Sequence, residues 1–372
     1  MTLNTRSIAA GEALDVLRQG WTAQSAGQMR VAYMLHGRPG VGKTEIVRQL
    51  SDEIGAKLFD LRLTTIEPQD LRGLPYFDHE TRRTIWYRPE DLPDDISHPS
   101  ILFLDELTAA APALQPAVYG LLQERRVGPH RLPDSTFVVA AGNTAEDGAI
   151  AYEMGTALSD RLVHLHVVAI ATDWLENYAI RKGLHPTVVA FIKTRPDLLE
   201  TTPQALQSGD MIAATPRSWE RVSQILETKP SRRIQNVLVA GTVGDAAAGE
   251  FALLADEVAA TVHIEDLLAA ESAKRWALYP ASLYGLNAVA FGLIGALDEG
   301  AVVPVVEVME GIRHLAAHRS EQAFSQMPLA ELCTYGFELL IRKALDQGLG
   351  EQILASPAYQ SYARDREAAG LG

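Results

Sequence analysis

The sequence is poor in two features that would assign it to particular classes of protein. Cysteine occurs once in 372 residues, as Cys333, so no internal disulfide can form and a reducing, cytoplasmic location is expected. Basic residues are outnumbered by acidic ones, 33 to 47, and the formal net charge is -14. This balance disfavours non-specific binding to nucleic acid, because such binding depends on neutralising phosphates. Cys333 lies in a helical pattern and is expected to be a buried thiol.

Long hydrophobic runs are also missing. The most apolar stretch, residues 281–297, is slightly short for a membrane span and contains Asn287 and several glycines. We therefore expect a buried helix there and no membrane segment. The first twenty residues lack a basic start followed by an apolar run, so no signal peptide is expected.

What the sequence does contain, up to about residue 170, is an alternation of short apolar runs with helical patterns. The runs predicted as strands are residues 31–35, 58–63, 101–107, 136–143 and 162–168. Continuous apolar runs are typical of parallel strands buried on both faces, so the alternation predicts an α/β domain with a parallel sheet in a three-layer arrangement. From about residue 172 helical spacing dominates, which predicts an all-helical remainder.

Two segments interrupt the α/β alternation. Residues 73–91 read as a hairpin with alternating polarity, and residues 123–134 as a smaller hairpin or loop. Each segment carries a pair of adjacent arginines. Such a pair is expected either in a solvated turn or on a contact surface.

A glycine-rich junction separates the first predicted strand from the first long helix. The stretch HGRPGVGKT, residues 36–44, fits the phosphate-binding loop pattern G-x-x-x-x-G-K-[ST]. Glycines let backbone N–H groups approach phosphate oxygens, and the following helix N-terminus adds further donors. Lys43 is expected to reach the β- and γ-phosphates of ATP, and Thr44 to ligate Mg²⁺. The residues expected to bind ATP are Gly37, Pro39, Gly40, Val41, Gly42, Lys43, Thr44 and Glu45.

Polar residues close two later strands. ILFLDE ends with Asp105, which is suited to hold Mg²⁺, and Glu106, which is suited to activate a water for attack on the γ-phosphate. TFVVAAGN ends with Asn143, whose amide is suited to bond the attacking water or the γ-phosphate. Two acids at a strand end can also be a solvated edge, and an asparagine can be a turn former.

Five stretches in this chain order resemble the motifs of AAA+ ATPases: HGRPGVGKT, ILFLDE, AAGN, LSDR and TPRSWE. EPQDLRGLP, residues 67–75, together with the two hairpin insertions, is similar to the MoxR family within that group. The resemblance covers roughly residues 10–260. It implies an AAA+ nucleotide-binding domain over 1–170, a helical lid over 171–264 and a C-terminal helical extension over 265–372.

The resemblance further implies a homo-oligomeric ring, usually a hexamer, with ATP between subunits. Arg161 then matches the arginine finger that reaches a neighbour's γ-phosphate, and Arg217 matches the lid arginine called sensor 2. Rival candidates for the finger are Arg125, Arg126 and Arg131. The aromatics Tyr76, Phe77, Trp86 and Tyr87 of the first insertion are candidates to contact a protein client or, alternatively, to pack on their own domain. MoxR-like proteins often act with a von Willebrand factor A domain protein.

These residues therefore predict an ATPase that remodels or activates a protein client. Three other functions share some of the motifs: a nucleic-acid motor of the helicase or restriction-associated kind, a scaffold that assembles on ATP without hydrolysing it, and a metal-chelatase motor subunit. The acidic balance argues against the first, and the adjacent Asp105 and Glu106 argue against the second.

Overall fold

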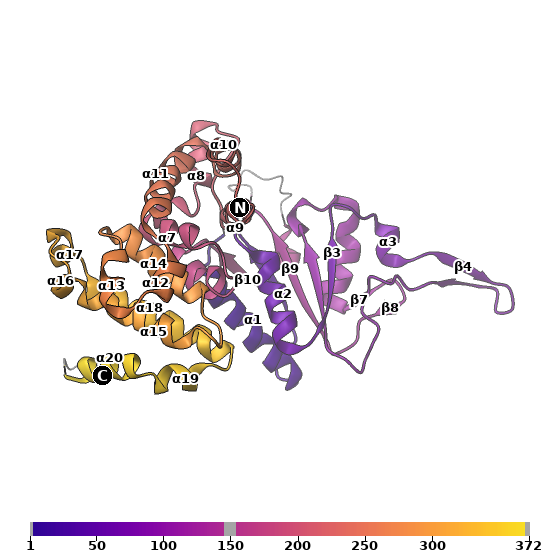
Figure 1. Cartoon of the computed structure of the whole chain (residues 1–372). Helices are drawn as coiled ribbons and strands as arrows, with labels where there is room; N and C mark the ends of the chain where they lie inside the picture. The colour runs from indigo at the N-terminus through magenta and orange to yellow at the C-terminus, as the bar shows by residue number, and fades with distance from the viewer. Residues whose placement is uncertain (1–2, 145–153, 369–372) are drawn as a thin grey trace. The chain divides into compact units, whose positions relative to one another are not determined.

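The chain divides into two compact units in the computed structural model, which describes residues 3–144 and 154–368 (Figure 1). The first unit comprises Met1–Ile170, Thr202–Asp210 and Thr215–Arg217. The second comprises Ala171–Thr201, Met211–Ala214 and Ser218–Gly372. The domain boundaries expected at residues 170 and 264 remain predictions, and each unit is described here by itself.

A parallel sheet forms the centre of the first unit. Its strands among the described residues are β1 (Ser7–Ile8), β2 (Ala32–His36), β3 (Lys57–Arg62), β6 (Ser100–Asp105), β9 (Thr136–Gly142) and β10 (Leu162–Val167). They lie in the order β1-β10-β2-β9-β6-β3, and every neighbouring pair is parallel. The predicted parallel α/β sheet is confirmed, and β1 is an edge strand that the sequence patterns did not reveal.

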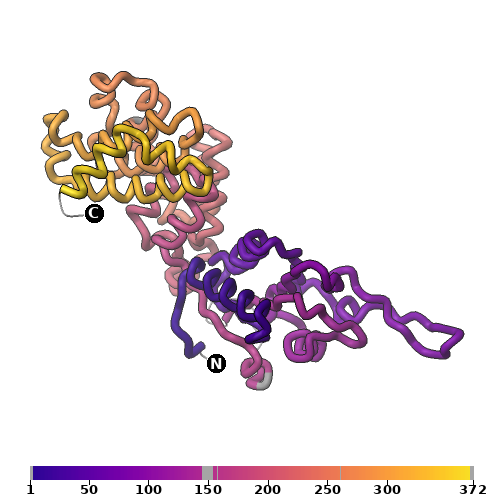
Figure 2. Tube along the Cα trace, turned by 90° about the horizontal axis from the view of Figure 1, so that it is seen from below, coloured from indigo at the N-terminus to yellow at the C-terminus, as the bar shows by residue number. Residues whose placement is uncertain are grey.

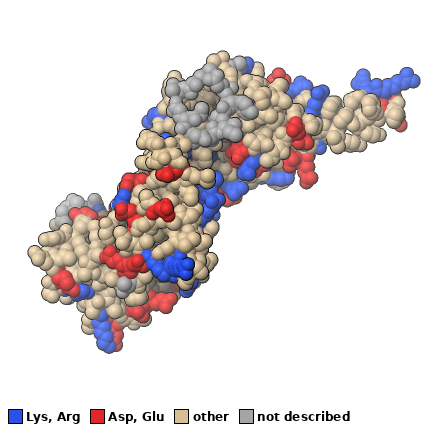
Figure 3. All heavy atoms as spheres, turned by 90° about the horizontal axis from the view of Figure 1, so that it is seen from above, with Lys and Arg blue, Asp and Glu red and all other residues tan. Residues whose placement is uncertain are grey.

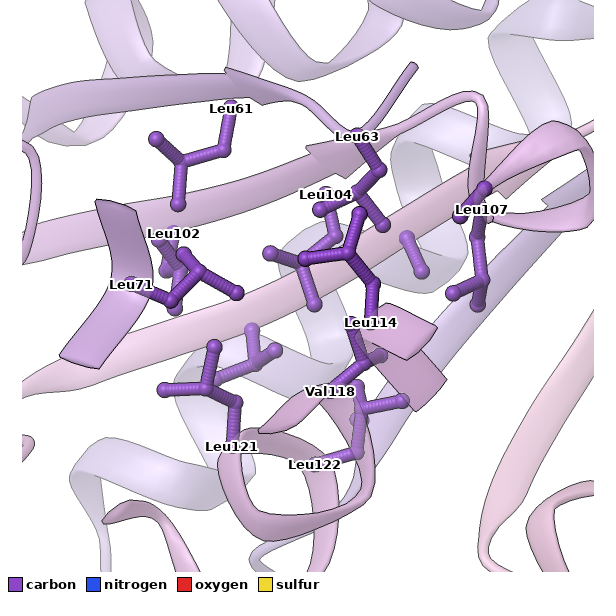
Figure 4. Close-up of a cluster of buried hydrophobic side chains, with 14 of the residues drawn as sticks. Leu61, Leu63, Leu71, Leu102, Leu104, Leu107, Leu114, Val118, Leu121 and Leu122 are labelled. Atoms are coloured by element: carbon purple, nitrogen blue, oxygen red, sulfur yellow. The ribbon is translucent and has the colours of Figure 1, made fainter. Parts of the chain in front are cut away.

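Both faces of this sheet are buried, because successive residues of a strand point to opposite sides. Leu102 and Leu104 belong to one apolar cluster, whereas Ile101 and Phe103 belong to the other. The first cluster packs the sheet against the helical segment after β6, as Figure 4 shows for Leu114, Val118 and their leucine neighbours. The second packs it against α1 and α2. The expected three-layer arrangement follows from these two clusters.

Helices complete the first unit. They are α1 (Ala10–Ser25), α2 (Lys43–Ile54), α3 (Pro68–Arg72), α4 (Gln115–Tyr119), α5 (Thr156–Ser159) and α8 (Thr202–Ser208), with short helical turns η1 (Leu107–Ala109), η2 (Pro112–Leu114) and η3 (Gly120–Glu124). The strand expected over 101–107 ends at Asp105, because Glu106 adopts a left-handed backbone conformation with φ 59° and so leaves the extended ladder.

Two small hairpins leave the main sheet. β4 (Pro75–Asp78) pairs antiparallel with β5 (Arg83–Trp86), and β7 (Arg126–Val127) with β8 (His130–Arg131). The first hairpin extends far from the sheet in both views of the chain trace (Figures 1 and 2). The predicted insertions are thus hairpins.

The second unit is helical throughout its described residues. Its helices are α6 (Ala171–Trp174), α7 (Pro186–Thr194), α9 (Pro216–Glu227, which begins in the first unit), α10 (Arg232–Val243), α11 (Asp245–Thr261), α12 (Ile264–Ala269), α13 (Ser272–Arg275), α14 (Leu283–Gly295), α15 (Val302–Gly311), α16 (Leu315–His318), α17 (Gln322–Gln326), α18 (Leu329–Asp346), α19 (Gly350–Ala355) and α20 (Pro357–Ala368). Phe191, Trp219 and Phe251 pack ring against ring in its core, with centroids 5.0 to 5.7 Å apart. The stretch expected as a buried helix is α14, and Cys333 is buried in α18 as expected.

Candidate active site

The backbone of the loop between β2 and α2 lies close to the backbone at the end of β10. A Cβ on Gly37 would lie 2.3 Å from the carbonyl oxygen of Val167, so no larger residue fits without a shift. Gly42 precedes the helix with φ 105°, a conformation that side chains rarely tolerate. No side chain caps the helix at Gly42. The N-terminus of a helix carries N–H groups without intrahelical acceptors and the positive end of the helix dipole, which is the setting that the phosphate-binding pattern predicts.

Lys43 lies at the centre of the loop. Its Nζ donates to the carbonyl oxygens of Gly37 and Arg38, the latter at 3.1 Å, and to Oδ1 of Asn143 at 2.8 Å. Asn143 reaches this point because β9 lies beside β2, with Gly142 opposite His36. The structure thus brings together two predicted site residues that are far apart in the sequence.

The pair expected to hold metal is also close together. Thr44 Oγ1 lies 3.5 Å from Oδ2 of Asp105, and Oδ1 of Asp105 accepts a hydrogen bond of 2.9 Å from the backbone N–H of Glu106. Asp105 is buried, and this burial raises the pKa of its carboxyl above the ordinary value. A hydroxyl and a carboxylate are oxygen ligands of the kind that Mg²⁺ takes alongside phosphates and water, so the donor set fits that ion.

Glu106 follows Asp105 but points toward the end of β3. Its carboxylate accepts a hydrogen bond from Thr64 Oγ1 and lies 3.8 Å from Nε of Arg62. Its side chain is 39% exposed, so water reaches it. The left-handed turn at Glu106 separates its direction from that of Asp105, which gives two adjacent carboxylates different surroundings.

Thr108, which the sequence patterns did not single out, fixes the backbone of Asn143. Its Oγ1 donates to the carbonyl oxygen of Asn143 at 2.9 Å and accepts from the N–H of Asn143 at 3.0 Å. A Cβ on Gly142 would lie 2.5 Å from the same oxygen, so the glycine makes this approach possible. The turn that follows Glu106 therefore sets the position of Asn143.

The two predicted arginines occupy different settings. Arg161 is half-buried between α5 and β10, and its N–H donates to the carbonyl oxygen of Leu158 at 3.1 Å. Arg217 is exposed in the first turn of α9, and its backbone N–H donates to the carbonyl oxygen of Gly40 at 3.3 Å. The backbone of Arg217 therefore contacts the phosphate-binding loop directly. Of the other loop residues, Val41 is buried in the core, Pro39 is exposed and Glu45 is half-buried.

The rival arginines differ in burial and in the hydrogen bonds that their side chains make. Arg125 donates to the carbonyl oxygens of Pro133 and Thr136, and its burial lowers the pKa of its guanidinium to about 10. Arg126 is exposed and donates to the carbonyl oxygen of Gly128 at 2.8 Å. Arg125 therefore holds its own hairpin, whereas Arg126 and Arg131 remain on the surface.

The aromatic side chains of the first hairpin also differ in their exposure to solvent. Tyr76, Phe77 and Tyr87 are 48%, 67% and 62% exposed. Trp86 is half-buried, with the guanidinium of Arg72 over its ring at 4.2 Å from the centroid. Trp86 thus packs on its own domain, and the other three face solvent.

Comparison with known proteins identifies the domain that carries this site. A family model described as AAA domain (dynein-related subfamily) matches residues 32–163. Residues 32–163 form an AAA+ ATPase domain. The AAA+ resemblance is confirmed for these residues, and the match supports the expected ATP hydrolase activity of the domain. The match does not resolve the MoxR family within the group.

Curated relatives match about a third of this chain. ATPase family gene 2 protein homolog B of Mus musculus is 39% identical over 115 residues, which are 31% of this chain and 13% of that protein. The protein of the same name from Bos taurus is 37% identical over 115 residues, 31% of this chain and 12% of its own length. The chain therefore matches about an eighth of the length of these relatives.

Solved structures resemble a larger share of the chain, but more loosely. A variant of RuvB from Thermotoga maritima has 14% identity and a TM-score of 0.37, over 76% of this chain and 80% of that chain. A putative ATPase from Cytophaga hutchinsonii has 15% identity and a TM-score of 0.32, over 87% and 88%. Scores this low support no functional argument. Within the described part of the chain, no helix has the length and apolar character to cross a membrane.

Proposed function

We propose that the chain is a MoxR-like AAA+ ATPase that hydrolyses ATP in a homo-oligomeric ring to remodel a protein client. The observation that carries this proposal is the meeting of Lys43, Asn143, Thr44 and Asp105 at the carboxyl ends of three neighbouring strands. Ligands of open α/β sheets bind at that edge. The hexameric ring, the cytoplasmic location and the client remain part of the proposal.

The phosphate end of the site would be held by α2 and the loop before it. The N–H groups of Gly40, Gly42 and Lys43 would bind phosphate oxygens of ATP, and the Lys43 ammonium would exchange a loop carbonyl for a phosphate oxygen. Thr44 and Asp105 would hold Mg²⁺, which supplies positive charge to the β- and γ-phosphates when bound.

Hydrolysis would be carried out by groups at the neighbouring strand ends. Glu106, half-exposed and free to exchange its bond to Thr64, would orient a water molecule and accept its proton. Asn143 would hydrogen-bond the water or the γ-phosphate from a backbone position fixed by Thr108. Arg217 would contact ATP from the first turn of α9, next to the loop carbonyl of Gly40.

Arg161 would act on the γ-phosphate bound by the neighbouring subunit. Such an arginine neutralises charge that develops on the phosphoryl group during transfer. One of the three rivals, Arg125, is held by hydrogen bonds to its own hairpin segment, which supports this choice.

The long hairpin would contact the client. It presents Tyr76, Phe77 and Tyr87 to solvent, and basic side chains lie at its far end with acidic atoms beside them (Figure 3). Arg82 and Arg83 are exposed at the turn of the hairpin. A partner of this surface would combine apolar side chains with acidic ones. A protein with a von Willebrand factor A domain is the proposed partner class.

A trap experiment tests this function. Glu106→Gln protein, held in ATP and Mg²⁺, should bind ATP, turn it over slowly and retain a specific protein from a lysate of its host. Lys43→Ala protein is the matched control, because it cannot bind the nucleotide and should retain nothing. Adding Phe77→Ser and Tyr87→Ser to the trap should release the client while leaving ATP binding intact. Nuclease-sensitive retention of DNA or RNA in place of protein would refute the client assignment.

A further inference from the structure

Two histidines lie side by side where β2 and β10 reach the phosphate-binding loop. His36 is the last residue of β2 and directly precedes Gly37. In the register of the two parallel strands, His36 is opposite His166 and Met34 is opposite His164. Because side chains alternate between faces, His36 and His164 lie diagonally on one face of the sheet. Neither histidine is assigned a role in the site, and the pattern G-x-x-x-x-G-K-[ST] itself begins at Gly37.

Direct hydrogen bonds join these side chains into a chain of three residues. Nε2 of His36 lies 2.7 Å from Nδ1 of His164, and the two ring planes are inclined by 21° with centroids 5.0 Å apart. Nε2 of His164 lies 2.9 Å from the carbonyl oxygen of Ser159 and 3.0 Å from its Oγ.

The carbonyl oxygen sets the direction of the whole chain. A carbonyl only accepts, so Nε2 of His164 carries a hydrogen and donates to Ser159. In a neutral imidazole the other nitrogen then accepts, and Nε2 of His36 donates to it. Each histidine thus has one tautomer that satisfies the contacts, and phenylalanine in either place would keep the ring while removing the bonds.

The ends of this chain are two functional segments of the same subunit. His36 continues into the phosphate-binding loop through Gly37. Ser159 is the last residue of α5, and the backbone passes from it through Arg161 into β10, where His164 lies. The hydrogen bond from His164 to Ser159 therefore closes a short loop around Arg161, and His36 ties that closed loop to the strand that carries the ATP site.

We propose that the chain His36–His164–Ser159 positions Arg161 and couples it to the phosphate-binding loop of its own subunit. This inference rests on the proposed role of Arg161 as the finger for the neighbouring subunit. A backbone change at Gly37 on ATP binding would displace His36, and the hydrogen bonds would pass the displacement to the Arg161 loop. Binding of ATP to one subunit would then set the position of the Arg161 that acts on the γ-phosphate of the neighbouring subunit. His36 and His164 are positioning residues in this proposal, because these hydrogen bonds join them to each other and to Ser159.

A double-mutant cycle tests whether His164 acts through Arg161. The steady-state kcat and KM for ATP are measured for the full chain and for His164→Phe, Arg161→Ala and the double variant. His164→Phe should lower kcat by about tenfold to a hundredfold, the loss that a misplaced catalytic group produces, with little change in KM. The double variant should be no slower than Arg161→Ala alone, because His164 has nothing to position once the Arg161 side chain is removed. His164→Gln, which keeps a donor and an acceptor, should recover part of the rate.

The same strand offers a matched control. His166 lies on the same face as His164, but its Nδ1 contacts Oγ of Ser7 at 3.0 Å, on the edge strand. His166→Phe should leave kcat within about twofold of the wild type, as expected for a group that positions no catalytic residue. His36→Phe should reproduce the loss of His164→Phe and repeats the test if the latter fails to fold, which thermal unfolding reports.

Two outcomes separate the inference from the function on which it rests. If the losses of His164→Phe and Arg161→Ala multiply in the double variant, or if His166→Phe is as slow as His164→Phe, the positioning role is refuted while the finger stands. If Arg161→Ala hydrolyses ATP at the wild-type rate, the finger itself is refuted and the inference falls with it.

Discussion

Thr108→Val removes the hydroxyl that holds Asn143 while keeping the shape of the side chain. In the wild type, Oγ1 of Thr108 makes two hydrogen bonds to the backbone of Asn143, at 2.9 and 3.0 Å. Thr108 is 9% exposed, so water replaces the lost partner only in part. Leaving one N–H and one carbonyl unpaired at a half-buried residue should cost about 2 kcal/mol of unfolding free energy.

The catalytic effect should exceed what this loss of stability explains. Asn143 loses its anchor to the turn after Glu106, so its amide is less well placed relative to Lys43. We expect kcat to fall about tenfold to a hundredfold, with the Kd for ATP within about twofold, because the phosphate-binding loop is untouched. The two quantities are measured by steady-state hydrolysis and by equilibrium titration of a fluorescent ATP analogue, and the stability by urea unfolding.

Thr108→Ser is the matched control, because it keeps the hydroxyl and loses only a methyl group. It should retain a kcat near that of the wild type despite some loss of stability. If Thr108→Val hydrolyses ATP as fast as the wild type, or if Thr108→Ser is as slow as Thr108→Val, the hydroxyl does not position Asn143 and the reasoning fails.

Three further outcomes follow from the same structure. Lys43→Ala should abolish ATP binding in an equilibrium titration, and measurable binding at wild-type strength would remove Lys43 from the site. Gly37→Ala should lower the unfolding free energy by about 2 kcal/mol, because its Cβ meets the Val167 carbonyl oxygen at 2.3 Å; an unchanged urea midpoint would contradict that contact. Burial raises the pKa of the Cys333 thiol to about 12, so at pH 8 the folded protein keeps a neutral thiol. A thiol reagent should then label Cys333 only after unfolding, as mass spectrometry would show, whereas fast labelling of the native chain would refute its burial.

The strands of the sheet could be predicted from the sequence because each rests on a local pattern. Residues such as Ile101, Leu102, Phe103 and Leu104 form a continuous apolar run, which is what burial on both faces requires. β1 has two residues and no run of its own, so its pairing with β10 depends on the rest of the sheet being in place. Local patterns carry no signal for such a strand.

The features of the site also differ in whether a local sequence pattern predicts them. The phosphate-binding loop is a sequence motif, because adjacent residues supply its glycines, lysine and threonine. The contacts of Glu106 with Thr64, and of Thr108 with Asn143, join the ends of different strands. These contacts depend on strand order and register, and a single threonine in a sequence pattern does not predict them. The hairpin aromatics show the limit most clearly, since only the structure separates the packed Trp86 from the exposed Phe77.

The most direct test of the central claim is a mixing experiment between two variants of low ATPase activity. Arg161→Ala subunits keep their own Glu106, and Glu106→Gln subunits keep their own Arg161. If ATP is hydrolysed between subunits with Arg161 acting on its neighbour, mixed rings contain intact composite sites. The mixture should then hydrolyse ATP faster than either variant alone. If no mixing ratio restores activity although the two variants co-assemble, Arg161 does not act across an interface and the proposed mechanism is wrong.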